Sequence, residues 1–356
     1  MSTLSPHLLL LPLSLLLLLS STLTTAQPPF QCTTTSTCMS LVGYISPNTT
    51  TLSRIQSLFQ VKTLRSILGV NNLPPSTPRN HTVRANSTVM IPIPCRCFDG
   101  VGMSNHVPNY TVVKDDGLFH IASQVFSGLV EYPKIVTANN IKDPNLILVG
   151  QDLWIPLPCS CNDVDGEKVV HYGHVAASGS TVGQIAAEFG TTSETLMRLN
   201  NMSDPKSLVA GQVLDVPLKA CSSSVSNSSP DFPMRIANGT YVYTANNCVM
   251  CTCDATNNYT MQCQPSGLTP VNWKTCPTMQ CPESSLSLGN STTQSACSRS
   301  TCAYAGFDKD HILTTLAVQN TCPGSEDNSS GALEIHWRGW SLAMVLFAMI
   351  MIQRTL

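Results

Sequence analysis

Charged side chains are scarce in this chain of 356 residues, where Asp, Glu, Lys and Arg make up only 11%. A typical soluble domain carries about 25%. The 19 Lys and Arg nearly balance the 21 Asp and Glu, giving a formal net charge of −2. A chain without an excess of either sign has no long-range field to attract nucleic acid or an anionic membrane surface. The composition therefore argues against nucleic acid as a partner.

Common catalytic signatures are also missing. The sequence has no G-x-S-x-G, H-E-x-x-H or G-x-G-x-x-G element. Asp115 and Asp116 are adjacent, whereas the two acids of a glycosidase stand on opposite sides of one bond, so a turn explains them better. His120, His171 and His174 fit exposed helix and strand positions better than a metal or catalytic site. We predict a protein that is not an enzyme and holds no metal or cofactor.

No apolar run reaches the roughly 20 residues that a membrane-spanning helix needs. The block Leu8–Leu19 precedes Thr24-Thr25-Ala26, and small residues in this position are typical of a signal-peptidase site. We predict that residues 1–26 are a signal peptide, cleaved before Gln27. An N-terminal membrane anchor is the alternative, but the block is too short for it.

The C-terminal end has the order of a GPI-attachment signal: small residues, the spacer Leu333–Gly339 and the apolar run Trp340–Ile352. We predict that residues 331–356 are removed and that lipid is attached at Ser330, Ser329 or Asn328. A short single-pass anchor is the alternative. Both interpretations place the protein in the secretory pathway and then on the outer face of the plasma membrane.

Cysteine, by contrast, is plentiful, and its 16 residues indicate an oxidising compartment and disulfide bonds. Ten N-x-[ST] sequons agree with a secreted surface. The tenth begins at Asn328, within the GPI signal. We predict that the other nine are N-glycosylated, at Asn48, Asn80, Asn86, Asn109, Asn201, Asn227, Asn238, Asn258 and Asn290.

An internal repeat organises the first two-thirds of the chain. Ile91–Cys97 (IPIPCRC) recurs as Ile155–Cys161 (IPLPCSC), and Val216–Cys221 is a frayed third copy. We expect each copy to be a short strand that proline closes, which suits an edge strand.

Each repeat is predicted to hold two helices between two strands. In the middle repeat, Tyr110–Val113 reads as a strand and Lys114–Gly117 as a turn, and Pro133 opens a second helix. The first helix of that repeat is indicated by apolar residues at helical spacing, Leu118, Ile121, Ala122 and Val125. The third repeat has the same spacing at Val182, Ile185, Ala186 and Phe189. A capping box is predicted at Thr191–Glu194.

These residues resemble the LysM module. In the third repeat the resemblance rests on Gly179–Val182, Ile185-Ala186, Leu199-Asn200 and Gly211-Gln212. In the middle repeat it rests on Asp115–Leu118, Ile121-Ala122, Asn139 and Gly150-Gln151. The first repeat matches only loosely, through Thr51-Leu52, Ile55, Phe59, Asn71 and Val89–Pro92.

With its Cys-x-Cys joints and two end signals, the chain resembles the plant LysM-domain GPI-anchored receptor proteins of the chitin elicitor-binding type. The resemblance implies an α+β fold of three small βααβ units clamped by disulfides, followed by a disulfide-rich irregular region. The expected boundaries are 27–97 for a degenerate LysM-like unit, 98–161 and 162–221 for two LysM units, and 222–330 for a cysteine-rich stalk or domain.

The first six cysteines lie at the joints between units, and from the residues alone they allow fifteen pairings. The resemblance implies Cys32–Cys97, Cys38–Cys161 and Cys95–Cys159, each stabilising the fold by about 2–4 kcal/mol. Zinc is a weak alternative, because ligand pairs usually leave two to four residues between them. Among the remaining ten, Cys248, Cys251 and Cys253 have metal-like spacing, but bridges are favoured in a secreted chain.

The resemblance also implies glycan contacts in two loops of the middle unit, whose main-chain groups and apolar side chains suit N-acetylglucosamine. The candidate residues are Lys114, Asp115, Asp116, Gly117, Leu118, Phe119, Asn140, Ile141, Pro144, Leu146 and Ile147. The third unit's counterparts are Ser178–Val182 and Met202–Val209, beside the sequon at Asn201. The first unit, with three sequons of its own, is not expected to bind.

The implied function is a cell-surface pattern-recognition receptor or co-receptor that binds chitin oligosaccharides. It would act in innate immune signalling with a LysM receptor kinase in the same membrane, because a lipid anchor cannot itself signal inward. Long polymers could bridge two copies, giving a homodimer with higher avidity. The alternatives are a peptidoglycan receptor, a cell-wall hydrolase that LysM units target, and a structural wall glycoprotein.

Overall fold

The computed structural model describes residues 30–33, 36–295 and 298–320. The predicted signal peptide, the GPI signal with its attachment residues, Cys297 and Cys322 lie outside the described residues. The chain divides into two compact parts, residues 1–290 with 301–317 and residues 291–300 with 318–356. Among the helices of the described residues, none combines the length and the apolar character needed to cross a membrane.

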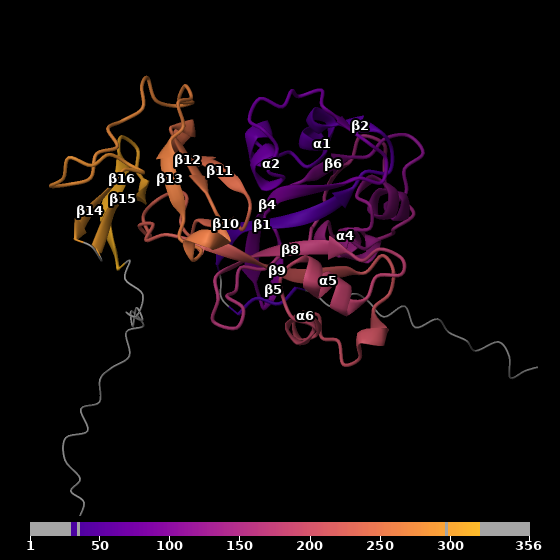
Figure 1. Ribbon diagram of the computed structural model, residues 1–356. Coiled ribbons are helices and arrows are strands. Elements are labelled where there is room, and N and C mark those ends of the chain that lie inside the picture. The colour runs from indigo at the N-terminus through magenta and orange to yellow at the C-terminus, as the bar shows by residue number, and fades with distance from the viewer. Residues whose placement is uncertain (1–29, 34–35, 296–297, 321–356) are drawn as a thin grey trace, which may run out of the picture. The chain divides into compact units, whose positions relative to one another are not determined.

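A six-stranded sheet, in the order β10-β9-β8-β1-β4-β5, forms the centre of the first part (Figure 1). Its strands are β1 (Thr37–Ile45), β4 (Thr88–Phe98), β5 (Val101–Ser104), β8 (Val169–Val175), β9 (Val213–Ser222) and β10 (Arg235–Ala237). The first unit supplies β1 and β4, and the third supplies β8 and β9. Parallel pairing of β1 with β8 joins them, and Gly43 permits it, since a Cβ there would lie 2.2 Å from the Tyr172 hydroxyl. The two units therefore share one sheet.

Each of the three units contains two short helices, as predicted. They are α1 (Leu52–Leu58) and α2 (Leu64–Val70), then α3 (Leu118–His120) and α4 (Tyr132–Ala138), and finally α5 (Val182–Glu188) and α6 (Ser193–Leu199). Threonine hydroxyls cap α1, α2, α5 and α6 by accepting from a backbone N–H three residues on. Helix α4 instead carries proline in its first turn, as Pro133 predicts.

The helix expected over Leu118–Val125 changes type after its first turn. It starts as α3 and continues as the π-helical turn η1 (Ile121–Val125), in which Phe126 N donates to Ile121 O. The wider turn still buries Leu118, Ile121 and Ala122. The predicted apolar face is therefore correct, although the helix is not regular.

The capping box predicted at Thr191–Glu194 is wrong. The N-cap of α6 is Thr192, whose hydroxyl accepts from Thr195 N, so Glu194 stands one position too early to complete the box. A full capping box occurs on α5 instead, between Thr181 and Gln184.

The expectation that proline closes each copy as an edge strand is also wrong for β4 and β9. Strand β4 runs through Pro92 and Pro94 while paired with β1, and β9 runs through Pro217 while paired with β8. In an antiparallel pair, alternate residues point their N–H away from a given neighbour. Pro92 and Pro94 lie two and four residues after Met90, so their main-chain nitrogens face the same side of the strand as that of Met90. The Met90 N–H points to Asn71 rather than to β1. Each proline therefore sits where the ladder needs no donor.

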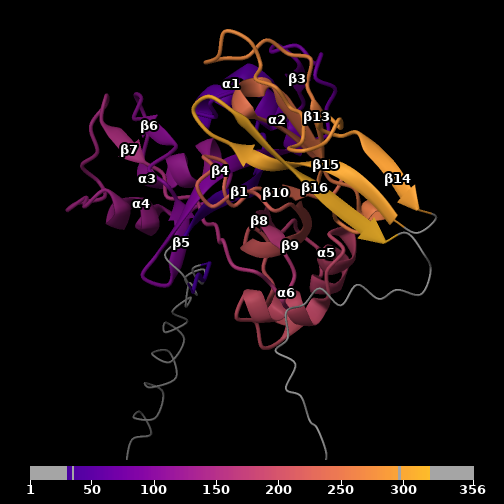
Figure 2. The same cartoon turned by 90° about the vertical axis from the view of Figure 1, so that its left-hand side faces the viewer.

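The middle unit has its own two-stranded sheet, β6 (Asn109–Thr111) with β7 (Asp152–Trp154). Figure 2 shows β6, β7, α3 and α4 grouped beside the central sheet. An aromatic row joins the middle unit to the first, with ring centroids 5.1 Å apart for Tyr44–Phe59, 5.6 Å for Phe59–Phe126 and 5.9 Å for Phe126–Tyr110. The first unit adds a second small pair, β2 (Thr50–Thr51) with β3 (Thr82–Val83).

One asparagine performs the same task in every unit. Asn71, Asn139 and Asn200 each follow the second helix, and each donates to a carbonyl four residues back. Each also exchanges two hydrogen bonds with the closing strand, at Met90, Trp154 and Asp215 respectively. This amide satisfies helix-end carbonyls and sets the distance between helix and strand. The loosely matching first unit is thus a true copy of the fold.

The bonded cysteine pairs at the joints are Cys32–Cys97, Cys38–Cys161 and Cys95–Cys159, the same three that the resemblance implies. Four further bridges lie beyond residue 220: Cys221–Cys253, Cys248–Cys276, Cys251–Cys263 and Cys281–Cys302. The three cysteines with metal-like spacing belong to three different bridges, so none offers a thiolate.

The region expected to be irregular contains β-structure and a small core. Its strands are β11 (Tyr241–Thr244), β12 (Val249–Thr252), β13 (Gln262–Pro265), β14 (Ser291–Ser295), β15 (Ser298–Phe307) and β16 (Ile312–Asn320). Ile236, Val249 and Leu288 are buried there among the cystines. Strand β11 packs against α2, where a Cβ on Gly69 would lie 2.0 Å from Tyr241 O. The part of this region around β11 is therefore a folded neighbour of the first unit.

Candidate functional site

Main-chain hydrogen bonds join the two candidate loops of the middle unit. Val112 N donates to Gln151 O at 2.9 Å, and Gly150 N donates to Val112 O at 2.8 Å. The side chain of Gln151 accepts from Leu148 N at 3.0 Å, which shapes the second loop from inside. Gly150 has φ +86, a region that favours glycine. The Gly-Gln pair therefore brings the loop after β6 against the loop before β7.

Asp116 is a structural residue of the first loop. Its Oδ2 accepts from Val113 N at 2.8 Å and from the Tyr110 hydroxyl at 2.9 Å, and the side chain is 3% exposed. Burial, together with this bond to Asp116, raises the pKa of Tyr110 to about 12. Asp115 adopts φ +70 in the turn. The two carboxylates thus shape a turn, as expected for adjacent aspartates, and Asp116 is occupied within the protein.

The other candidate residues divide by exposure. Leu118 is buried, and Gly117, Ile141 and Ile147 are half-buried, the two isoleucines against the core. The exposed candidates are Lys114, Asp115, Phe119, Asn140, Pro144 and Leu146. A ligand can reach this second group, whereas the first group holds the loops in place.

Three exposed apolar residues of the same loops are missing from the predicted set. Leu148 and Val149 are each 70% exposed, and Val113 is 53% exposed, while Phe119 and Leu146 reach 71% and 70%. We call Val113, Phe119, Leu146, Leu148 and Val149 the loop patch. Single exposed apolar residues are normal, whereas these five gather on two loops that main-chain hydrogen bonds join. The signal in the sequence was the apolar run directly before Gly150.

The third unit repeats the loop scaffold without the patch. Ala176 N donates to Gln212 O, Gly211 N to Ala176 O, and Val209 N to Gln212 Oε1, as in the middle unit. Aligned on these bonds, Val209 matches Leu148. At the positions equivalent to Phe119, Leu146 and Val149, the third unit has Gly183, Ser207 and Ala210. The third unit therefore presents a much less apolar surface at this place.

All nine predicted glycosylation sites lie within the described residues, and every one of these asparagines is exposed. Asn48, Asn80 and Asn86 lie in the loops of the first unit that match the candidate loops, and Asn201 lies in that of the third. The middle unit carries its sequon on β6, at Asn109. A glycan on each sequon would thus cover the loops of the outer two units and leave those of the middle unit open.

The prediction that His171 is exposed is wrong. It is 2% exposed on β8, with Nδ1 2.7 Å from Asp215 Oδ1 and Nε2 2.9 Å from Asn162 O. The shared sheet and the chain after Cys161 cover it from both sides, which periodicity within one unit does not reveal. His120 has a 53% exposed side chain, as predicted, and His174 is half-buried.

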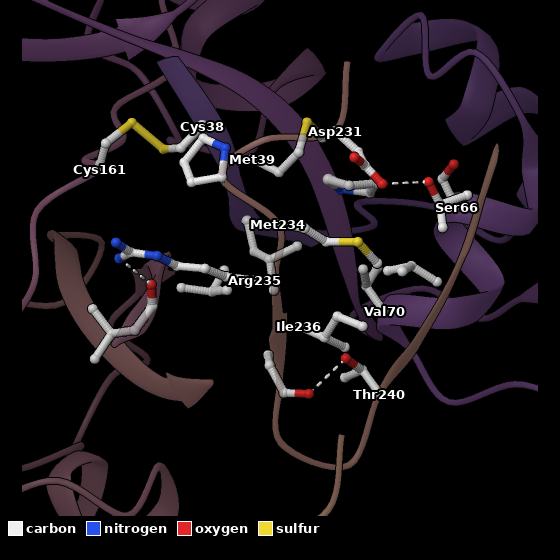
Figure 3. Close-up of a pocket in the computed structure, with 18 of the residues that line it drawn as sticks. Cys38, Met39, Ser66, Val70, Cys161, Asp231, Met234, Arg235, Ile236 and Thr240 are labelled. Carbon is white, nitrogen blue, oxygen red and sulfur yellow. Dashed lines mark hydrogen bonds between the residues drawn. A yellow bond between two sulfur atoms is a disulfide. The ribbon is translucent and has the colours of Figure 1, made fainter. Parts of the chain in front are cut away.

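An apolar cavity of about 230 Å³ lies between the first unit and β10, with Met39, Val70, Met234 and Ile236 on its walls (Figure 3). Its charged groups are used within the protein: Arg235 donates to Val169 O and pairs with Asp163 at 2.7 Å. The carboxylate of Asp231 accepts from three hydroxyls, those of Ser229, Thr244 and Tyr304. The two charged side chains of the cavity are therefore already engaged within the protein.

Comparison with known proteins gives matches over nearly the whole chain. The LysM domain family matches residues 110–156 and 174–217. LysM domain-containing GPI-anchored protein 2 of Arabidopsis thaliana is 49% identical over 330 residues, 91% of each chain. Chitin elicitor-binding protein of Oryza sativa subsp. japonica is 40% identical over 328 residues, 91% of this chain and 90% of its own.

A more distant relative is Chitin elicitor receptor kinase 1 of Physcomitrium patens. It is 24% identical over 189 residues, which cover 52% of this chain and 28% of the kinase. The shared part of that kinase is thus a minor share of its length. The identity and coverage of the first two relatives decide the family: the chain belongs to the LysM domain-containing GPI-anchored proteins.

Proposed function

We propose that the protein is a cell-surface receptor for chitin oligosaccharides, which it binds through N-acetylglucosamine at the loop patch of the middle unit. The observation that carries the proposal is the set of five exposed apolar side chains on two loops that Gly150-Gln151 joins. The name of the Oryza relative, an elicitor-binding protein for chitin, supports the ligand.

The chemistry of the patch suits an acetylated amino sugar. Phe119 and Leu146 would pack against the acetamide methyl and the apolar face of the ring, and main-chain groups of the loops would bind the acetamide. Burying one such side chain contributes about 1.5–3 kcal/mol. Because the patch is shallow, we expect weak binding of short oligomers and tighter binding of long ones, which can bridge two copies.

Anchorage and partners complete the proposal. Residues 1–26 and 331–356 would be removed, and lipid at Ser330, Ser329 or Asn328 would hold the protein on the outer face of the plasma membrane. A protein held in this way requires a transmembrane partner, and a LysM receptor kinase would fill that role. Chitin elicitor receptor kinase 1 shares sequence with about half of this chain, which supports a receptor kinase as the partner. We propose a binding role without catalysis.

Calorimetry of the glycosylated secreted protein with chito-octaose tests the proposal. We expect one binding event per chain, and absence of heat at millimolar ligand would refute it. Competition by soluble muropeptides separates chitin from peptidoglycan, because only a peptidoglycan receptor would prefer them. Mass spectrometry of the oligosaccharide after incubation should return it intact, and shortened products would instead favour the hydrolase.

A further inference from the structure

Charge is unevenly distributed along the chain, although its total nearly balances. The first unit has six cationic side chains and no aspartate or glutamate, because the first acidic residue of the chain is Asp99. The cations are Arg54, Lys62, Arg65, Arg79, Arg84 and Arg96. The middle and third units together have 13 acidic and 7 basic residues. The first unit therefore has a positive field of its own, whereas the other two units are acidic.

The two loops of the first unit are joined in the same way as those of the middle unit. Ser46 N donates to Ser87 O at 3.0 Å, and Asn86 N donates to Ser46 O at 2.7 Å. In the middle unit, Val112 takes part in the same two bonds. Asn86 has φ +61, in the left-handed region that Gly150 occupies in the middle unit. The first unit therefore has the same loop scaffold without the Gly-Gln pair.

Arginines border the part of this scaffold that corresponds to the loop patch. Aligned on the same bonds, Arg84 stands where the middle unit has Leu148. Arg79 O accepts from Ser53 N at 3.0 Å, so the main chain at Arg79 lies beside the residue that precedes Arg54. Strand β2, which directly precedes α1 (Figure 1), pairs with β3, which ends one residue before Arg84. We call Arg54, Arg79 and Arg84 the arginine cluster.

The arginine cluster lacks an acidic partner in the part of the chain that the structure describes. All three residues are exposed, and the ion pairs among the described residues involve none of them. A guanidinium presents its donors in a planar fork, which fits a carboxylate through two parallel hydrogen bonds. The cluster therefore offers three such forks to carboxylates that a partner must supply.

The sequons around the cluster favour an acidic polysaccharide over an acidic protein face. Asn80 directly follows Arg79, and Asn86 lies two residues after Arg84. Glycans on these asparagines would keep away a protein face, which typically buries about 800 Å² on each partner. A single sugar chain can pass between them. A polymer with a carboxylate on each sugar can also bind several arginines at once, and each further contact is then intramolecular.

We propose that the first unit binds a linear polyuronate, an acidic polysaccharide with a carboxylate on each sugar, through ion pairs with Arg54, Arg79 and Arg84. The site is separate from the loop patch, whose side chains are apolar. The first unit would thus attach the ectodomain to acidic polysaccharide at the cell surface, while the middle unit stays free for its own ligand. Because these ion pairs form at an exposed surface, salt weakens them.

Interferometry with immobilised polygalacturonate and the glycosylated secreted protein tests the proposal. At low ionic strength we expect binding that weakens as salt is added. The fully methyl-esterified polymer has the same sugars without the charge, and it should not bind. Failure to bind polygalacturonate, or equal binding of both polymers, would overturn the proposal. These measurements use the unaltered chain, so they do not depend on the folding of a variant.

A variant of the arginine cluster locates the site. Arg54→Gln with Arg79→Gln and Arg84→Gln should weaken binding of polygalacturonate at least about tenfold, because three charge-assisted contacts are lost. The matched control removes three exposed positive charges outside the first unit, through Lys219→Gln, Lys274→Gln and Lys309→Gln. It should weaken binding less than about twofold. Equal losses in the two variants would overturn the proposal, because only the net charge would then matter.

An acidic face of a second copy is the other occupant that the charges fit, and sedimentation at low ionic strength distinguishes it. Self-association that the arginine variant loses, without binding of polygalacturonate, would overturn the proposal and identify the second copy. Calorimetry with chito-octaose should give the same affinity for the wild type and the arginine variant, and a loss in the variant would overturn the separation of the two sites. Binding of polygalacturonate is measured without chitin, so the proposal and the receptor function can fail independently.

Discussion

The middle and third units have the same scaffold but present different surfaces. Both units place an asparagine after the second helix and join their two loops by hydrogen bonds at a Gly-Gln pair. The exposed positions differ, because Leu146 and Val149 of the middle unit correspond to Ser207 and Ala210 of the third. The residues that make the fold thus occupy positions distinct from those that face a ligand. A repeat can therefore keep its structure while its surface changes function.

The largest expected effect comes from removing the patch. Phe119→Ala with Leu146→Ser should weaken binding of chito-octaose at least about tenfold, since the two contacts together exceed the 1.4 kcal/mol that a tenfold change represents. Calorimetry measures the change. The matched control is Val209→Ser in the third unit, which should leave affinity unchanged. Equal losses in both variants would contradict the distinction between the units.

The shared asparagine should affect stability most in the third unit. Asn200→Ala removes the partner of Asp215 O and Asp215 N in a buried site, whereas Leu196 O keeps the N–H of residue 200, and we expect a loss of about 2–3 kcal/mol in the free energy of unfolding. Asn139→Ala removes equivalent bonds at a half-buried site that water can reach, so about 1 kcal/mol is expected. Urea unfolding with the disulfides intact measures both. A larger loss for Asn139→Ala would show that burial does not control the cost.

A pH dependence of stability should be specific to the third unit. Burial alone lowers the pKa of His171, but the Asp215 carboxylate and the bonds to Asp215 and Asn162 outweigh it, so the pKa is raised, even with Arg235 nearby. Protonated His171 therefore stabilises the fold fully below about pH 6.5, and this stability is lost as the pH rises through the folded-state pKa.

The melting temperatures of the wild type and His171→Gln, compared from pH 5 to 8, isolate this contribution. The advantage of the wild type should be largest at pH 5 and should shrink toward pH 8. Subtracting the variant removes the opposite contribution of His174, whose pKa burial lowers. His120→Gln, at an exposed site of the middle unit, is the control and should follow the wild type. A constant advantage across this range would show that His171 does not titrate.

The smallest expected effect is a gain of binding in the third unit. Ser207→Leu with Ala210→Val gives that unit two of the apolar residues of the loop patch, and Asn201→Gln removes the neighbouring sequon. Calorimetry of this triple variant should show a second, weaker site for chito-octaose. Asn201→Gln alone is the control. A stoichiometry that stays at one would mean that the patch needs Phe119 as well, where the third unit has Gly183.

Local features of the fold could be predicted from the sequence, and long-range ones could not. Helical spacing predicted the first helix of the middle and third units, because consecutive turns of a short helix repeat the apolar residues of its buried face. The pairing of β1 with β8 depends on contacts between residues about 130 positions apart, so no local pattern predicted that His171 would be buried. Resemblance, rather than spacing, chose among the fifteen possible pairings of the first six cysteines.

The candidate site could also be predicted only in part from the sequence. The sequence identified both loops, but the predicted glycan set included Leu118, which helical spacing already assigns to the buried face, together with Phe119, which is exposed. It also missed Leu148 and Val149, because a run of four apolar residues from Leu146 to Val149 has no period that reveals which of them is covered. That choice depends on how Gln151 folds the loop from within.

The sheet that the first and third units share has a consequence for how such proteins can diversify. An exchange of gene segments that moved either of these units alone would expose a strand edge in both the donor and the recipient, and aggregation would follow. In the middle unit, β6 and β7 form a separate two-stranded sheet, so the loops between them can accumulate substitutions with less disturbance to the shared sheet. New sugar specificities should therefore arise most readily in the central copy.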